Sequence, residues 1–243
     1  MMNHWTFFAF PLNLLIAALW IWGWVMMWRR HSRAVRVLLS PSATISAFVL
    51  LILSCLWIGL SGDRTFVESL IFVTILLYVQ TVLLLVTLRG WKTPAGDIRW
   101  RFLLLHSGLL LAVGAGFWGA PDSSEMRVAL ERGQETQVAY NMDGTMSGLD
   151  YTLELKDFHT EYSAAGGPVD YEAVVSVDGA APVSLTVNNP YSVSLGEDIY
   201  LASVNQEFCI LQIVSEPWKY FALFGILMLL TGAFMLFIKG PRR

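Results

Sequence analysis

The sequence predicts a membrane protein with five transmembrane α-helices and a small extracytoplasmic all-β domain between the fourth and fifth helices. Three observations predict this fold class. First, 55% of the 243 residues are hydrophobic and 14% are charged, which is too apolar for an ordinary soluble globule. Second, the apolar residues gather in five uncharged stretches. Third, most acidic residues gather in one segment between the last two stretches.

Each apolar stretch is long enough to be a transmembrane helix, since a crossing needs about 17–25 mostly apolar residues. The stretches cover residues 5–28, 43–60, 70–88, 102–120 and 220–238. None contains an acidic or basic residue, as the high cost of a charge in mid-membrane predicts. The first stretch lacks a basic leader and a small-residue cleavage site, so we expect it to be retained rather than removed as a signal peptide.

The basic residues predict the orientation, because Lys and Arg accumulate in cytoplasmic loops. Eleven of the 16 basic residues follow the first helix, lie between the third and fourth helices, or follow the fifth helix. The N-terminus is therefore expected outside and the C-terminus in the cytoplasm. We divide the chain into a four-helix membrane domain (1–120), an outer domain (121–218), and a fifth helix with a basic tail (219–243).

The outer domain is strongly acidic and has the pattern of a β-sheet. It carries 16 of the 19 acidic residues against three basic ones, a formal charge of about −13, although the net charge of the chain is only −3. Such a domain is not expected to bind nucleic acid. Short alternating segments predict an antiparallel, sandwich-like domain. They cover residues 149–155, 171–177, 183–187, 199–204 and 208–214.

His106 is the candidate functional residue. It is the one histidine within a predicted span, about 6 Å into the apolar layer from Phe102 at the helical rise. An ionisable side chain there is a functional-site hypothesis, and neutral imidazole in an apolar surround suits an axial ligand of haem iron. The alternative, to which the residue pattern gives equal weight, is that His106 only hydrogen-bonds a neighbouring helix.

Other features of the spans are expected to serve helix packing. Three small residues, Gly108, Ala112 and Gly116, form a seam that lets another helix approach. The expected neighbour is the fifth helix, with Ala222, Gly225 and Gly232. His106 projects about 120° away from this seam. Two polar residues, Asn13 and Gln80, are expected to make interhelical hydrogen bonds. The tryptophans at positions 20, 22 and 24 are expected to contact lipid or helices, with stacking on a flat macrocycle as the alternative.

The sequence lacks the motifs of several enzyme classes. There is no Gly-x-Ser-x-Gly, His-Glu-x-x-His or phosphate-binding Gly-rich loop, and no Cys-x-x-Cys or Cys-x-x-Cys-His motif. The other histidines, His4, His31 and His159, have no strong ligand cluster beside them in sequence.

Four segments together resemble the ResB (CcsB) family of cytochrome c biogenesis proteins. The run 102–115 resembles its histidine-bearing helix, and 153–162 followed by Gly167, Pro168 and Tyr171 resembles its LxLxxFxxEY…GxPxxY strands. The segment 187–203 resembles VNxP…GxxIYxxS, and 216–225 resembles the DPxxxxxYxG entry to the last helix. The resemblance rests on the order and spacing of these four segments taken together.

The resemblance implies a subunit of a system II cytochrome c synthase in the bacterial cytoplasmic (inner) membrane. In that family a ResB-like and a CcsA-like protein together export haem and attach it to apocytochrome c. The resemblance implies that His106 is an axial ligand of haem b iron in transit, with the haem behaving as a substrate. The expected partners are a CcsA-like membrane protein, apocytochrome c, haem and membrane lipid. The chain would then belong to a haem lyase complex without being an enzyme alone.

Two other functions remain open at this point. One is a non-catalytic, membrane-anchored subunit for protein binding or assembly, in which His106 is structural. The other is a b-type or quinone-linked electron carrier, although a stable bis-histidine haem would need a second intramembrane histidine.

Overall fold

The computed structural model describes residues 8–62, 64–162, 168–205 and 207–239, and the chain divides into two compact units. The helical unit comprises residues 3–121 and 218–243, and the β unit comprises Asp122–Pro217. His4 lies outside the described residues.

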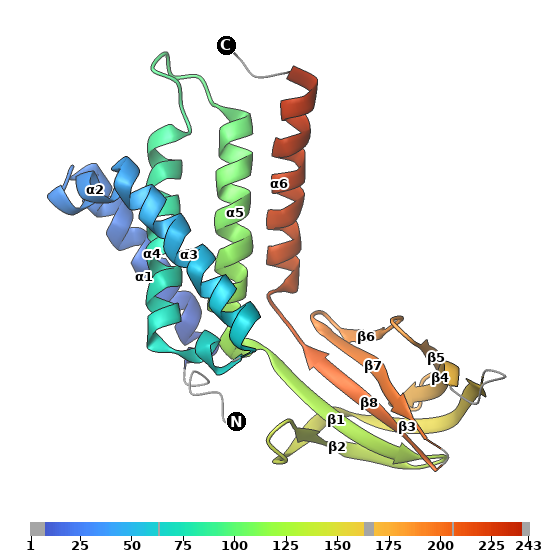
Figure 1. Cartoon of the computed structure of the whole chain (residues 1–243). Helices are drawn as coiled ribbons and strands as arrows, with labels where there is room; N and C mark the ends of the chain where they lie inside the picture. Colours follow the sequence, from blue (N-terminus) through green and yellow to red (C-terminus); the bar gives the residue numbers. More distant parts are fainter. Residues whose placement is uncertain (1–7, 63, 163–167, 206, 240–243) are drawn as a thin grey trace. The chain divides into compact units, whose positions relative to one another are not determined.

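The helical unit contains five long apolar helices and one short helix (Figure 1). They are α1 (Leu12–Arg29), α2 (Arg33–Leu38), α3 (Pro41–Ser61), α4 (Leu70–Gly90), α5 (Trp100–Gly119) and α6 (Lys219–Lys239). All except α2 are long and apolar enough to cross a membrane, which confirms the five apolar helices expected from the sequence. The first helix begins at Leu12, later than expected, because Pro11 has no N–H and stands just before the helix.

Serine side chains mark where the helices begin. Ser40 accepts a hydrogen bond from the Ala43 amide at 3.2 Å, and Ser69 accepts one from the Phe72 amide at 3.2 Å. Each serine thus satisfies one of the amides that a helix start leaves without an intrahelical partner. A 3₁₀ turn (η2, Arg64–Glu68) joins α3 to α4, and a short turn from Trp91 to Arg99 joins α4 to α5.

The helices pack through small residues where they come closest. Figure 1 shows α5 and α6 side by side along most of their length. A Cβ on Gly225 of α6 would lie 2.7 Å from both the Gly108 carbonyl oxygen and the Ala112 nitrogen of α5. This confirms the expected seam at Gly108 and Ala112. Gly116 is not part of it, since it is exposed and a Cβ there would meet nothing within 4 Å.

The β unit is one antiparallel eight-stranded sheet, placed in sequence between α5 and α6. Its strands follow the order β5-β4-β3-β2-β1-β8-β7-β6. The bounds are β1 (Ser124–Glu131), β2 (Glu135–Asn141), β3 (Met146–Tyr162), β4 (Pro168–Val177), β5 (Val183–Thr186), β6 (Tyr191–Ser194), β7 (Glu197–Val204) and β8 (Phe208–Ser215). The antiparallel all-β prediction is confirmed, and β1, β2 and β6 add to the segments expected from the sequence.

The sheet curls so that its two ends meet. The edge strands β5 and β6 follow each other in sequence with only residues 187–190 between them, and β7 contacts β4 and β5 across the interior. The concave face encloses one apolar core. Its fully buried members are Leu130, Ala139, Leu153, Leu155, Ala173, Val175, Leu185, Ile199, Cys209, Leu211 and Ile213. The core therefore lies between the β1–β5 part of the sheet and the β6–β8 part.

Candidate functional site

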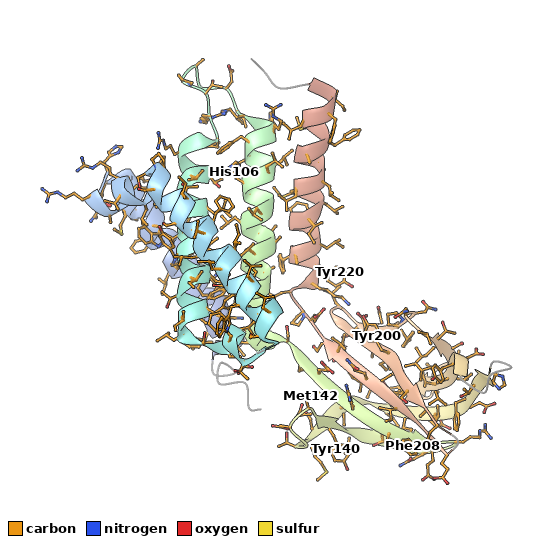
Figure 2. The ribbon with its side chains drawn as sticks, in the orientation of Figure 1. His106, Tyr140, Met142, Tyr200, Phe208 and Tyr220 are labelled. Atoms are coloured by element: carbon orange, nitrogen blue, oxygen red, sulfur yellow. The ribbon has the colours of Figure 1, made fainter. Side chains whose placement is uncertain are left out.

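Helix α5 holds His106 on a face that its packing against α6 leaves free. The seam residues Gly108 and Ala112 lie against α6, and the helical repeat turns His106 about 120° from Ala112. His106 is half-buried, and Figure 2 labels it on α5. The helix thus fixes the backbone of the histidine and leaves the side chain partly exposed.

Three side chains on this face of α5 stack in sequence order. The Phe102 ring lies on the His106 imidazole with 3.8 Å between ring centroids and 22° between planes. The Arg99 guanidinium carbon lies 5.0 Å from the centroid of the same Phe102 ring. Phe102 is held in place because its ring fills the space where a Cβ on Gly90 of α4 would lie. The stack was not predicted from the sequence, although the spacing of positions 99, 102 and 106 on one helix face could have revealed it.

A backbone hydrogen bond sets the tautomer of His106. Nδ1 lies 2.9 Å from the carbonyl oxygen of Phe102. Because a carbonyl oxygen can only accept, Nδ1 carries the proton and Nε2 keeps its lone pair. Among the described residues Nε2 has no hydrogen-bond partner. Metal-ligating histidines show this arrangement, in which one nitrogen donates to a backbone carbonyl and the other binds the metal.

Charged side chains lie at the start of α5, on the N-terminal side of His106. A cavity of about 350 Å³ there is lined by Arg99, Arg101 and Phe102 together with Thr93, Asp97 and Met235, but not by His106. Arg99 and Arg101 supply two positive charges within two turns of the histidine.

A buried polar network ties α1, α4 and α5 together. The Asn13 amide donates to the Trp118 carbonyl oxygen at 2.8 Å, and the Trp118 indole donates to Gln80 Oε1 at 3.2 Å. Both Asn13 and Gln80 are buried, so their predicted interhelical role is confirmed. Trp118 was not anticipated from the sequence. Trp20 of α1 packs against it with 6.0 Å between ring centroids, while Trp22 is largely exposed.

In the β unit, Gly196 lies just before β7, where the close approach of Pro217 after β8 requires a glycine. Gly196 has φ +96°, and a Cβ there would lie 2.7 Å from the Pro217 Cα. The Glu216 amide donates to the Gly196 carbonyl oxygen at 2.6 Å. The GxxIY and Glu-Pro segments noted in the sequence therefore meet in space.

The turn after β5 brings the two edges of the sheet together. Asn188 adopts φ +60°, a conformation that asparagine tolerates better than most residues. The Asn189 amide donates to the Thr186 carbonyl oxygen at 3.1 Å. The VNxP-like segment is thus the structural link that closes the sheet onto itself.

Charged side chains dominate the outside of the β unit, and burial governs its interior. Thr145 donates to the Asp143 carboxylate through its hydroxyl at 2.6 Å and its amide at 2.9 Å, which lowers the pKa of that carboxyl. Burial, with the Glu197 carboxylate nearby, raises the pKa of the Tyr151 phenol. Burial raises the pKa of the Cys209 thiol to about 12. Neither buried group lies on a surface that a ligand could reach.

One apolar surface interrupts the acidic exterior. The end of the β2–β3 hairpin exposes Tyr140, Met142 and Met146, with exposed fractions of 50%, 56% and 71% (Figure 2). Tyr140 pairs directly with Met146 across the hairpin, so their side chains share one face.

The other histidines do not assemble a metal site among the described residues. His159 is exposed on β3, where it faces Glu172 of β4, and His31 is exposed at the turn between α1 and α2. No group of three or more His, Cys, Asp or Glu side chains with metal-binding geometry occurs in the described ranges.

Comparison with known proteins supports one family. Residues 98–208 match the model of the ResB-like family, a segment that contains α5 with His106 and most of the β unit. No curated protein gives a significant match. Among solved structures, the chain is similar to "Cytochrome c Heme Lyase CcmF", with 13% identity and a TM-score of 0.45. The similarity covers 80% of this chain and 34% of that one, so the chain spans about a third of its length.

Proposed function

We propose that this chain, whose residues 98–208 are ResB-like, is a subunit of a membrane cytochrome c synthase complex. In this role His106 binds the iron of haem b as the haem crosses the membrane. The partners are a CcsA-like membrane protein and apocytochrome c. The β unit and the N-terminus face the outside of a bacterial cytoplasmic membrane, and the C-terminus faces the cytoplasm.

The geometry of His106 is the observation that carries this proposal. Its Nδ1 is committed to the Phe102 carbonyl oxygen, which leaves the lone pair of Nε2 available to a ligand. Stacking on Phe102 fixes the imidazole plane, so little side-chain entropy is lost when a ligand binds. An apolar helix face with one open imidazole nitrogen fits one axial side of a haem.

The rest of the haem site comes from a second protein. No second histidine lies within the predicted spans, so the other axial ligand belongs to the partner. Arg99 and Arg101 lie at the basic end of α5 and offer guanidinium groups to the propionates of the same haem. The haem is therefore held between subunits, which suits a cargo that must later be released.

Assembly of a c-type cytochrome tests this function. The chain and a CcsA-like protein are co-expressed in a bacterial strain without its own synthase, and covalent haem on a reporter cytochrome is measured. We expect His106→Ala to abolish the yield, while His159→Ala, which alters an exposed β-strand histidine, retains it. Equal yields from wild type and His106→Ala, at equal membrane levels of the two proteins, would refute the assignment.

A second candidate function is protein binding without haem ligation. The apolar hairpin end formed by Tyr140, Met142 and Met146 favours it, because exposed apolar side chains in a highly charged domain often mark a protein contact. In this case Met142→Ser with Met146→Ser abolishes capture of the partner, and His106→Ala has no effect on cytochrome yield. Unchanged partner capture by the double variant would exclude this role for the hairpin.

A further inference from the structure

An apolar cavity lies in the helical unit away from His106. It measures about 660 Å³, which is within the usual range of small-molecule sites. Its walls come from α1, η2, α4 and α5, and most are aliphatic or aromatic. The aromatic members are Phe8, Phe72, Phe117 and Trp118. Four aromatic side chains around one space provide surfaces for stacking a flat ring.

The polar residues that line this cavity are few. They are Glu68 of η2, Asn13 of α1 and Trp118 of α5. Glu68 is the charged member of this lining and the other walls are mostly apolar, a combination that disfavours an anionic ligand, including the propionates of a haem. The part of the ligand that enters the cavity is therefore expected to be uncharged.

One buried hydrogen-bond donor next to the cavity has no partner among the described residues. Gln80 is fully buried, and its Oε1 must face the Trp118 indole because an N–H needs an acceptor. This leaves the two N–H groups of Gln80 Nε2 unpaired. Gln80 does not itself line the cavity, but Leu76 and Leu77, one turn earlier on α4, and Trp118, which donates to Gln80, all do. An unpaired donor buried in a membrane helix is unfavourable, and a ligand carbonyl oxygen that accepted from it would remove that cost.

We propose that this cavity binds a neutral amphipathic molecule with a flat, carbonyl-bearing ring and an apolar tail, the chemistry of an isoprenoid quinone. The ring stacks among the aromatic side chains, and a ring carbonyl accepts from the Gln80 amide. The tail leaves along the aliphatic wall into the lipid. This site is distinct from the proposed haem site, because neither His106, Phe102 nor Arg99 is among the residues that line it.

Gly116 provides a variant that fills the cavity without a clash. It lines the cavity, and a Cβ at this position would meet nothing within 4 Å. Gly59 of α3 is a matched control, since it is also a helical glycine with nothing within 4 Å but does not line the cavity. Gln80→Leu removes the unpaired donor while keeping most of the side-chain volume.

Binding is measured by calorimetric titration of decylubiquinone into the full chain in phosphatidylcholine nanodiscs. We expect saturable binding to wild type and to Gly59→Leu, and about tenfold weaker binding to Gly116→Leu and Gln80→Leu, which corresponds to about 1.4 kcal/mol. Wild-type-like binding to Gly116→Leu would overturn the site. Wild-type-like binding to Gln80→Leu, or equal competition by diacylglycerol or by haemin, would overturn the carbonyl-ring ligand. Cytochrome yield is scored separately, so failure here leaves the haem proposal intact.

Discussion

The packing of α5 against α6 makes a quantitative prediction at Gly225. In Gly225→Ala the added Cβ would lie 2.7 Å from the Gly108 carbonyl oxygen and 2.7 Å from the Ala112 nitrogen. Backbone atoms cannot rotate away as a flexible side chain can, so the two helices must separate. Overpacking of this kind costs about 1–3 kcal/mol.

The expected change in thermal stability follows from that cost. For a chain of 150–250 residues, 1 kcal/mol lowers Tm by about 2–4 °C, so we expect Gly225→Ala to lower Tm by about 2–12 °C. Gly59→Ala is the matched control and should leave Tm within about 2 °C, since its Cβ meets nothing within 4 Å. The assay is the temperature at which the detergent-solubilised chain loses its monodisperse peak in size-exclusion chromatography. Equal Tm values for the two variants would refute the close approach of α5 and α6.

Three further predictions concern other contacts. Gly196→Ala places a Cβ 2.7 Å from Pro217 at φ +96° and should destabilise the β unit by about 1–3 kcal/mol, measured by chemical denaturation followed by tyrosine and tryptophan fluorescence. The buried Cys209 thiol, whose pKa is raised to about 12, should resist iodoacetamide at about pH 8 until denaturant unfolds the sheet; peptide mapping separates it from the exposed Cys55, and modification of Cys209 itself in the native chain would contradict its burial. Trp118→Phe removes the indole donor to Gln80 and should cost about 1–3 kcal/mol, seen as a lower Tm, and an unchanged Tm would argue against the network.

The apolar helices were predictable because each span must be continuous and uncharged. An uncharged run such as residues 70–88 must satisfy its own backbone hydrogen bonds in a membrane, which favours a helix. The observed helix α4 covers Leu70–Gly90. The start of α1 was less well predicted, because hydropathy continues through residues before Pro11 while the helix begins only after it.

The strands at the start of the β unit were missed although their pattern is present. In β1, Met126, Val128 and Leu130 are buried and alternate with exposed residues. Their segment follows the fourth span directly, and its charged residues Glu125, Arg127 and Glu131 lower its mean hydropathy, so the alternation is easily overlooked. The four-residue strand β6 is too short for alternation to identify it.

The sequence identified His106 as the candidate residue but did not predict which side chains surround it. His106 was evident because a lone histidine in a span is unusual. Its Nδ1 contact, the Phe102 stack and the fit of Phe102 over Gly90 depend on side-chain directions and on the approach of α4, which local sequence does not specify. Gly116 was expected in the helix-packing seam but lines a cavity instead. Which of the two a small residue does depends on where the neighbouring helices lie, and local sequence does not specify that.

The absorption spectrum of the purified complex tests the haem-ligand assignment most directly. The chain is co-purified with the CcsA-like protein as wild type, His106→Gly and His159→Gly, and the haem spectrum is recorded before and after addition of imidazole. The account predicts that His106→Gly loses the haem band and that imidazole restores it, because the free base replaces the missing Nε2 ligand. His159→Gly should match wild type. A haem band of wild-type position and intensity in His106→Gly without imidazole would contradict the account.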